Sequence, residues 1–245
     1  MKKIILLILI SILCLSICNY MFYKTPVFIN KGFTLCYDGQ DTNVNLINTN
    51  GYYTETVISR THPNDLYTGF SKERIDTNRR GFILFKDGTC AYHFMWYTTH
   101  KDPVPYFKEI VYNDSLYTGN FYKYIYWGMY HIINDTVIAQ CTRRPILFSN
   151  GDSWDGYEYR YKIIDRNTIQ CISEEIICRK RDKKYNNMYL GERTFYPAKF
   201  IPTEVVPTSN GWIKKKKWFW CNKEDWKAYK EKMKKNEKYN NKYLL

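Results

Sequence analysis

Three stretches of the chain each place a short polar turn between two runs that are rich in aromatic and β-branched residues. The stretches are GFILFKDGTCAYHF (81–94), YIYWGMYHIINDTVIAQC (124–141) and YEYRYKIIDRNTIQCISEEII (157–177). Aromatic and β-branched side chains suit the pleated surface of a sheet, and a polar turn between two such runs is typical of an antiparallel hairpin. The pattern therefore predicts six strands in three consecutive hairpins.

Each turn implies a register, because residues opposite one another must point to the same face of the sheet. Around Asp87-Gly88 we expect a tight type I′ turn, with Phe85 opposite Cys90 and Ile83 opposite Tyr92. Around Asn134-Asp135 the expected pairs are Ile132 with Val137, Tyr130 with Ala139 and Gly128 with Cys141. Around 165–167 they are Ile163 with Ile169, Tyr161 with Cys171 and Tyr159 with Ser173. Each hairpin then has one apolar face, which predicts a shared interior.

Two more strands are expected beside the hairpins, at 51–58 (GYYTETVI) and 193–200 (RTFYPAKF). Eight antiparallel strands in succession favour closure, because a barrel leaves no unpaired edge. The polar segments 59–80 and 98–120 are interpreted as loops at the barrel ends. The predicted fold class is therefore all-β, an eight-stranded antiparallel up-and-down barrel.

The N-terminus carries Lys2 and Lys3 before an apolar run from Ile4 to Cys18. This order is typical of an export signal or a membrane anchor with the basic end in the cytoplasm. Leu15-Ser16-Ile17-Cys18 is similar to a bacterial lipoprotein signal, which makes Cys18 a candidate for lipidation. An uncleaved transmembrane anchor and a lipid-anchored Cys18 both remain open. In either case we expect a protein of the bacterial cell envelope whose folded part lies outside the cytoplasm.

The net charge of +13 is unevenly distributed, since the part from Lys214 to the C-terminus carries +8 and the body is nearly balanced. Within that part, Asn222 is a good N-cap, and Trp226, Tyr229 and Met233 recur at helical spacing. We expect a basic amphipathic helix whose aromatic stripe packs against the barrel or across an open end, after a solvated stretch at Lys214–Lys217. Lys214 to Lys235 is then a candidate contact for an anionic envelope surface, and nucleic acid is not an expected partner.

Signals of catalysis and metal binding are weak. The chain has no C-x-x-C pair, no G-x-S-x-G and no Gly-rich phosphate loop, so we expect no catalytic residue, no cofactor and no metal site. His93 and His131 fall on expected outward faces and are interpreted as surface residues. Cys90, Cys141 and Cys171 are expected to point inward as small hydrophobic residues, and the disulfide state of the chain stays open.

Several of these motifs resemble those of the lipocalin-like domains found in many exported, membrane-anchored bacterial proteins. The resemblance covers about 51–200 and lies in Gly51-Tyr52-Tyr53, Phe85-x-Asp87-Gly88-Thr89, Gly128-x-Tyr130-x-Ile132, Asp135-Thr136-Val137, Tyr161-x-Ile163 and Thr168-Ile169. It implies a lipocalin-like barrel and says little about function, because these are turn and packing motifs.

The barrel interior supplies the candidate ligand-binding residues, which are aromatic side chains on inward faces or near strand ends. They are Tyr92, Trp96, Tyr126, Tyr130, Tyr157, Tyr159 and Tyr161. Buried phenol hydroxyls need partners, which can be one another, water or a ligand. Two interpretations remain: the rings fill the core, or they line a pocket for a small hydrophobic compound.

The chain is accordingly divided into an anchor (1–23), a linker (24–50), a lipocalin-like barrel (51–205) and a basic aromatic segment with a C-terminal helix (206–245). The first functional hypothesis is a membrane-tethered, non-enzymatic envelope protein that binds a small hydrophobic ligand in the barrel. The second is a structural or surface-interaction protein whose filled barrel presents loops and a basic helix to glycans, lipid headgroups or protein partners.

Overall fold

The computed structural model describes residues 32–39, 45–61, 73–94, 103–112, 121–122, 125–142, 156–177 and 192–242. The expected anchor at 1–23 and Cys18 lie outside these residues. Within the described part of the chain, no helix is both long enough and apolar enough to cross a membrane.

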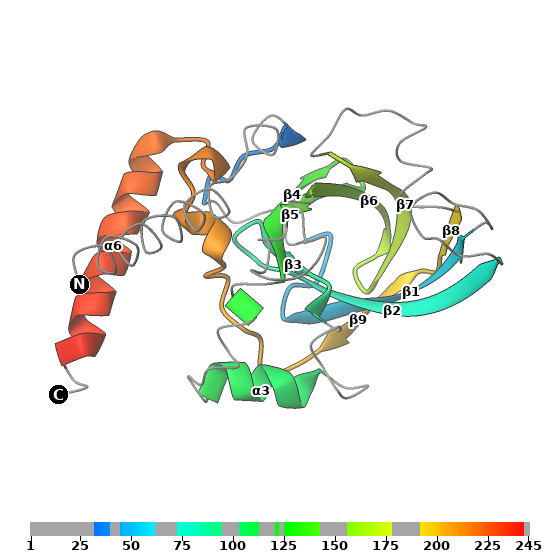
Figure 1. The fold of residues 1–245 in the computed structure, drawn as a ribbon, viewed down its shortest axis with the longest axis horizontal. Coiled ribbons are helices and arrows are strands. Elements are labelled where there is room, and N and C mark those ends of the chain that lie inside the picture. Colours follow the sequence, from blue (N-terminus) through cyan, green and yellow to red (C-terminus); the bar gives the residue numbers. More distant parts are fainter. Residues whose placement is uncertain are drawn as a thin grey trace, which may run out of the picture.

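The described residues form an antiparallel barrel of eight strands with one additional strand (Figure 1). The strands are β1 (Gly51–Thr61), β2 (Arg74–Leu84), β3 (Thr89–Tyr92), β4 (Tyr126–Ile133), β5 (Thr136–Thr142), β6 (Gly156–Asp165), β7 (Thr168–Ile176), β8 (Glu192–Phe195) and β9 (Ala198–Pro202). Neighbours in sequence pair from β2 to β7, β7 pairs with β9, and β1 closes the barrel between β9 and β2. The predicted all-β antiparallel barrel is confirmed.

The last predicted strand, 193–200, is divided into β8 and β9, which both pair with β1. Tyr196 and Pro197 separate them, and proline has no N–H to donate to a ladder. β8 therefore continues along the far half of β1 as the additional strand, while β9 completes the barrel.

The second and third hairpins have the predicted registers over most of their length. Tyr130 lies opposite Ala139, and Tyr161 lies opposite Cys171. One pair is wrong: Tyr159 lies opposite Glu174 rather than Ser173, because the register shifts between Arg160 and Tyr161. This bulge turns Glu174 inward, where it is almost fully buried.

The predicted register of the first hairpin is wrong by one residue. Leu84 lies opposite Cys90 and Phe82 opposite Tyr92, so Ile83 and Phe85 face outward. The turn is longer than the expected type I′ turn: the Gly88 N–H donates to the Phe85 carbonyl and the Phe85 N–H donates to the Thr89 carbonyl. Gly88 has φ of 83°, a conformation that favours glycine, and the extra turn residue shifts the pairing.

The two segments interpreted as loops contain regular structure. β1 runs on to Thr61 and β2 begins at Arg74, so a part of 59–80 is a long two-stranded extension of the barrel wall. Helix α3 (Val104–Tyr112) lies within 98–120. The strand extension was hidden because its exposed polar residues look like loop residues in the sequence. The start of α3 was hidden because Pro103 and Pro105 are typical of loops, although proline is tolerated in the first turn of a helix.

Two hydrophobic clusters share the barrel wall. One fills the interior, with Tyr53, Phe82, Tyr92, Tyr130, Tyr159 and Tyr161 among its members. The other lies on the outer face, where Ile83, Phe85 and Trp127 contact residues of α3 and of the C-terminal segment, including Phe107, Ile213 and Phe219. The first hairpin is consequently buried on both faces, which explains its nearly continuous apolar sequence.

The C-terminal segment is attached to this outer face by close packing and by a covalent bond. It consists of the short 3-10 helices η2 (Trp212–Lys215) and η3 (Lys217–Phe219) and the helix α6 (Lys223–Lys242). Gly211 lies directly against the Trp127 indole, where a side chain would not fit. A disulfide joins Cys36 to Cys221, and Tyr37 forms a β-bridge with Trp220. The N-terminal residues 32–39 and the C-terminal segment thus cover one side of the barrel together.

Candidate functional site

A row of stacked aromatic rings occupies the centre of the barrel. The ring centroids are 5.5 Å apart for Tyr53 and Phe82, 4.8 Å for Phe82 and Tyr92, and 4.7 Å for Tyr92 and Tyr159. The ring planes deviate from parallel by 10°, 6° and 5°. These four rings come from β1, β2, β3 and β6, so the stack joins distant parts of the wall and leaves no space for a ligand between its members.

The sequence-predicted ligand residues fall mostly in this interior. The hydroxyls of Tyr130, Tyr159 and Tyr161 bond to protein atoms, and that of Tyr92 is buried without a hydrogen-bond partner among the described residues. Tyr92, Tyr130, Tyr159 and Tyr161 are almost completely buried, Tyr126 is buried, Tyr157 is half-buried, and Trp96 lies outside the described residues. The Tyr130 hydroxyl donates to the Phe85 carbonyl at 2.8 Å, and the Tyr161 hydroxyl donates to Glu55 Oε1 at 3.3 Å. Their role in binding stays a prediction.

The three cysteines expected to point inward do so. Cys90, Cys141 and Cys171 are buried with free thiols, and burial raises the pKa of each thiol well above its ordinary value. A neutral thiol in apolar surroundings is unreactive, so these residues act as small core side chains.

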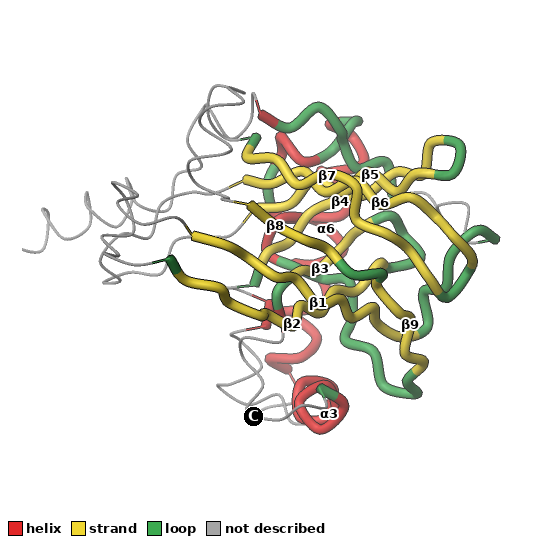
Figure 2. Tube along the Cα trace, turned by 90° about the vertical axis from the view of Figure 1, so that its right-hand side faces the viewer, coloured by secondary structure: helices red, strands yellow, loops and turns green. Residues whose placement is uncertain are grey.

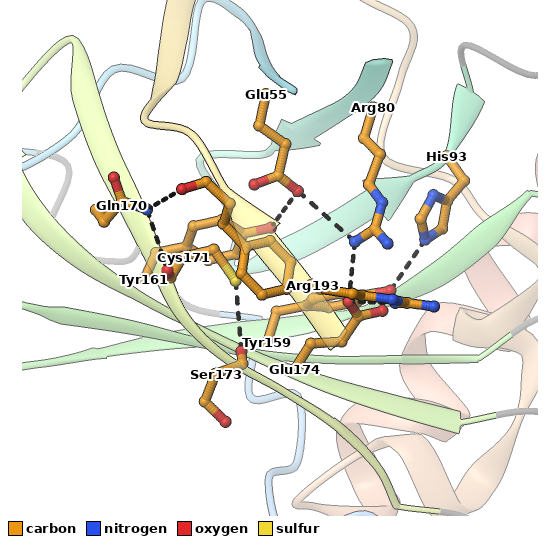
Figure 3. A network of polar contacts seen from close by, with 11 residues as sticks. Glu55, Arg80, His93, Tyr159, Tyr161, Gln170, Cys171, Ser173, Glu174 and Arg193 are labelled. Atoms are coloured by element: carbon orange, nitrogen blue, oxygen red, sulfur yellow. Dashed lines mark hydrogen bonds and ion pairs between the residues drawn. The ribbon is translucent and has the colours of Figure 1, made fainter. Parts of the chain in front are cut away.

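A cluster of charged side chains lies inside the barrel at one end (Figure 3). Glu174 Oε2 accepts from Arg80 Nη1 at 3.0 Å and from Arg193 Nη1 at 2.5 Å. Glu55 Oε1 lies 3.9 Å from Arg80 Nη1. We call these four residues, which come from β1, β2, β7 and β8, the mouth cluster.

The pKa values of the two carboxyl groups of the mouth cluster are shifted in opposite directions. Burial is the largest influence on both and disfavours the ionised form. At Glu174 the two arginines outweigh burial and hold the pKa below its ordinary value. At Glu55 burial prevails over Arg80, and the nearby Glu174 charge adds to it, which raises the pKa to about 7. One carboxyl is therefore a fixed anion and the other changes its charge near neutral pH.

His93 adjoins this cluster, and its interpretation as a surface residue is wrong. It is buried, and its Nε2 lies 2.9 Å from the Tyr159 hydroxyl. His93 follows the last residue of β3 and has φ of 63°, so the alternation of the strand does not apply to it. His131 is half-buried, and its Nε2–H donates to the Cys36 carbonyl at 3.2 Å.

The mouth cluster was not identified from the sequence. Period-two alternation from Tyr53 does place Glu55 on the inward face, and this was the available signal. The sequence carries no such signal for the other three: Arg80 lies in a segment that is typical of a loop, Glu174 turns inward through a bulge, and Arg193 lies on β8, the strand that is added to the barrel.

A second buried ion pair fixes the C-terminal segment to the turn of the first hairpin. Lys214 is 4% exposed, and its Nζ donates to Asp87 Oδ2 at 2.6 Å and to the Ser209 hydroxyl at 3.0 Å. Burial lowers the pKa of Lys214 although Asp87 opposes the change. The expectation of a solvated Lys214–Lys217 stretch is therefore wrong for its first residue, while Lys215 and Lys217 are exposed.

The predicted C-terminal helix is confirmed, and its N-cap is Asn222, whose Oδ1 accepts from the Glu224 N–H at 2.9 Å. Its aromatic stripe packs on η2 and on the residue after η3 rather than on the barrel: Trp226 Nε1–H donates to the Lys215 carbonyl, and the Tyr229 ring lies 5.3 Å from that of Trp220. Figure 1 shows α6 standing beside the barrel. Its lysines up to Lys235 are exposed.

A groove of about 700 Å³ lies beside Asp87, between the turn of the first hairpin and residues 203–209. Three of the hydroxyls in its wall bond to protein atoms: Ser209 donates to Asp87, Thr208 Oγ1 is bonded to the Tyr122 hydroxyl, and Thr203 donates to the Val205 carbonyl. No group of three His, Cys, Asp or Glu side chains in the described part of the chain is arranged to hold a metal ion.

Comparisons with protein-family models, with curated proteins and with solved structures found no match to this chain.

Proposed function

We propose that this protein is a non-enzymatic, membrane-tethered protein of the bacterial cell envelope, with a lipocalin-like barrel that is filled by its own side chains. The barrel serves as a rigid support, and the exposed basic helix α6 contacts an anionic surface of the envelope. This is the second of the two functional hypotheses drawn from the sequence.

The observation that carries the proposal is the ring stack. Tyr92 lies between Phe82 and Tyr159 with centroid separations of 4.8 and 4.7 Å, which is van der Waals contact on both faces. A hydrophobic ligand in the barrel would have to displace these rings and give up their contacts. The packed interior therefore supports a role for the outer surface rather than for a central pocket.

Export is supported by two independent features. The sequence begins with a basic and then apolar segment typical of a signal or anchor. The Cys36–Cys221 disulfide joins the two ends of the folded part, and such bonds persist in oxidising compartments outside the cytoplasm.

The surface role is supported by the charge of α6. Lys223, Lys230, Lys232 and Lys235 are exposed, whereas Lys227 and Lys234 pair with Glu224 and Glu231 of the same helix. A lysine close to an anionic membrane contributes about 1 kcal/mol of attraction, so four lysines provide salt-sensitive binding.

The test uses the full-length protein in neutral nanodiscs and measures its binding to separate vesicles with and without anionic lipid. We expect binding to anionic vesicles that high salt abolishes and that the combined change of Lys223, Lys230, Lys232 and Lys235 to Gln removes. The matched control changes Lys162 and Lys199, which lie on the barrel, to Gln and keeps the binding. Binding to an anionic polysaccharide but not to the vesicles would replace lipid by glycan as the partner.

The same preparation tests the competing hypothesis. Titration with the uncharged apolar probes decanol and cholesterol, which carry no carboxylate for the charged residues of the barrel, is followed by intrinsic fluorescence and is expected to show no saturable binding. Saturable binding that Tyr159→Ala abolishes would refute the filled barrel and restore the ligand-carrier hypothesis.

A further inference from the structure

The mouth cluster lies at the end of the barrel that is opposite the short turns. β1 ends at Thr61, β2 begins at Arg74 and β8 begins at Glu192, and the pairing of these strands places all three positions at one end (Figure 2). The side-chain exposure decreases inward, from 20% for Arg193 to 10% for Arg80 and 1% for Glu55. Arg193 is therefore the outermost of these three side chains, and the ring stack lies further inside the barrel.

Two polar atoms of the mouth cluster are buried without a hydrogen-bond partner among the described residues. They are Arg193 Nε, which carries a hydrogen to donate, and Glu55 Oε2. Glu55 is at least nine-tenths buried, and its carboxyl group points into the cluster beside Arg80 (Figure 3). Buried polar atoms are normally satisfied, so each of these two requires a water molecule or a ligand.

The charge of the cluster indicates which kind of ligand it accepts. With both carboxylates ionised, two arginines and two glutamates balance. When Glu55 is protonated, the arginines face the single charge of Glu174, and the cluster carries one positive charge. Guanidinium groups bind carboxylates and phosphates in charge-assisted hydrogen bonds. The Nε–H of Arg193, at the outer side of the cluster, is then able to donate a hydrogen bond to an oxygen of such a group.

We propose that the mouth cluster binds a carboxylate or phosphate group of a small polar molecule, which accepts a hydrogen bond from Arg193 Nε while Glu55 takes up one proton. The proton binds to a Glu55 oxygen and comes from solvent, and no covalent bond to the ligand forms. Because the ring stack fills the barrel below, the rest of the ligand lies on the side of the mouth cluster that faces away from the stack.

Glu55 is the group that couples binding to pH. The titratable side chains that face Glu55 come from the surrounding strands. They are Arg80 on β2, Tyr92 on β3, Tyr161 on β6, Cys171 and Glu174 on β7, and Arg193 on β8. Burial raises the pKa values of Tyr92, Tyr161 and Cys171 above their ordinary values, and Glu174 stays ionised. Of these groups, Glu55 alone has a pKa of about 7, and a bound anion raises it further.

The experiment follows the side-chain Nε–Hε resonance of Arg193 in full-length protein with ¹⁵N-labelled arginine, in non-ionic detergent. The signal is assigned by its loss in Arg193→Lys. Inorganic phosphate, acetate and benzoate are titrated at pH 6 and at pH 8 with constant chloride. We expect saturable shifts of this resonance. For acetate and benzoate, which carry one negative charge at both pH values, we expect a dissociation constant about tenfold larger at pH 8, because one proton is taken up on binding near a pKa of about 7. The three anions distinguish a carboxylate from a phosphate ligand.

Two variants and one control make the result specific. Glu55→Gln is neutral at both pH values, and we expect it to bind acetate and benzoate equally at pH 6 and pH 8. Arg193→Lys keeps the charge but loses the Nε donor, and we expect at least about tenfold weaker binding by calorimetry. Arg74→Gln removes an exposed arginine of β2 that pairs with Asp76, and it should bind like the wild type.

The proposal is overturned if none of the three anions shifts the Arg193 resonance, which would assign the unpaired atoms to water. It is also overturned if wild type and Glu55→Gln show the same dependence on pH, or if Arg193→Lys binds as tightly as wild type. The outcome is separate from the vesicle experiment, since changing the four lysines of α6 to Gln leaves the mouth cluster intact.

Discussion

The protonation of Glu55 makes the stability of the barrel depend on pH in a direction that the structure fixes. Its pKa is about 7 in the folded protein, against an ordinary value of 4.5. A raised pKa means that the folded state holds the proton more tightly than the unfolded state. The resulting stabilisation is fully present below pH 4.5 and is lost as the pH rises through 7.

The size of the effect follows from the shift. One pKa unit corresponds to about 1.4 kcal/mol, so a shift from 4.5 to about 7 corresponds to about 3 kcal/mol of stability. The pKa of Glu174 is lowered, so its contribution to the free energy of unfolding is present above its ordinary pKa of 4.5. This contribution is lost only as the pH falls below that value. Of the two carboxylates, Glu55 is therefore the one that changes its charge between pH 5 and pH 8.

The assay is urea unfolding of the full-length protein in non-ionic detergent at several pH values from 5 to 8, followed by tryptophan fluorescence. We predict that the free energy of unfolding of the wild type falls by about 2–3 kcal/mol over this range and that Glu55→Gln removes most of the fall. Glu204→Gln, at an exposed position, serves as the control and keeps the wild-type dependence. Equal pH dependence in wild type and Glu55→Gln would refute this account of the mouth cluster.

Three further predictions concern the attachment of the C-terminal segment. Lys214→Met leaves the Asp87 carboxylate without its buried partner and should lower the free energy of unfolding by about 2–4 kcal/mol in urea titrations. Lys215→Met, at an exposed position, should change this free energy little. Equal effects of the two changes would contradict the buried pair. Gly211→Ala places a methyl group 2.2 Å from the Trp127 ring, so we expect the free energy of unfolding to fall by about 1–3 kcal/mol and the near-ultraviolet circular dichroism spectrum to change. Asn210→Ala is the control. A native spectrum and melting temperature of Gly211→Ala would show that the packing is looser than described. Reduction of the Cys36–Cys221 disulfide should cost about 2–5 kcal/mol of stability, measured by thermal melting with and without reductant. A variant with both cysteines replaced by Ser should melt like the reduced wild type and ignore reductant, and an unchanged melting temperature on reduction would disprove the contribution.

The architecture was accessible from the sequence because alternation is a local signal. In the third hairpin, Tyr161 and Cys171 are buried while Arg160 and Lys162 are exposed, as their alternating positions predict. The first hairpin differs, since both of its faces are buried and alternation no longer marks the inward side. Its register depended on the turn alone, and the additional residue before Gly88 displaced it.

The polar features escaped prediction because they depend on contacts between residues far apart in the chain. Arg80 meets Glu174 and Glu55 only after the barrel closes, and a lysine-rich stretch gives no sign that Lys214 will be covered by Asp87 and Ser209. A buried charge and a solvated one look alike in a sequence, and their difference appears only when the partners are placed.

The central claim is that the barrel is filled by its own aromatic rings, and nuclear Overhauser effects between selectively labelled rings test it most directly. The account predicts cross-peaks between Phe82 and Tyr92 and between Tyr92 and Tyr159, unchanged by decanoate. Absence of these cross-peaks, or their loss on addition of decanoate, would contradict it.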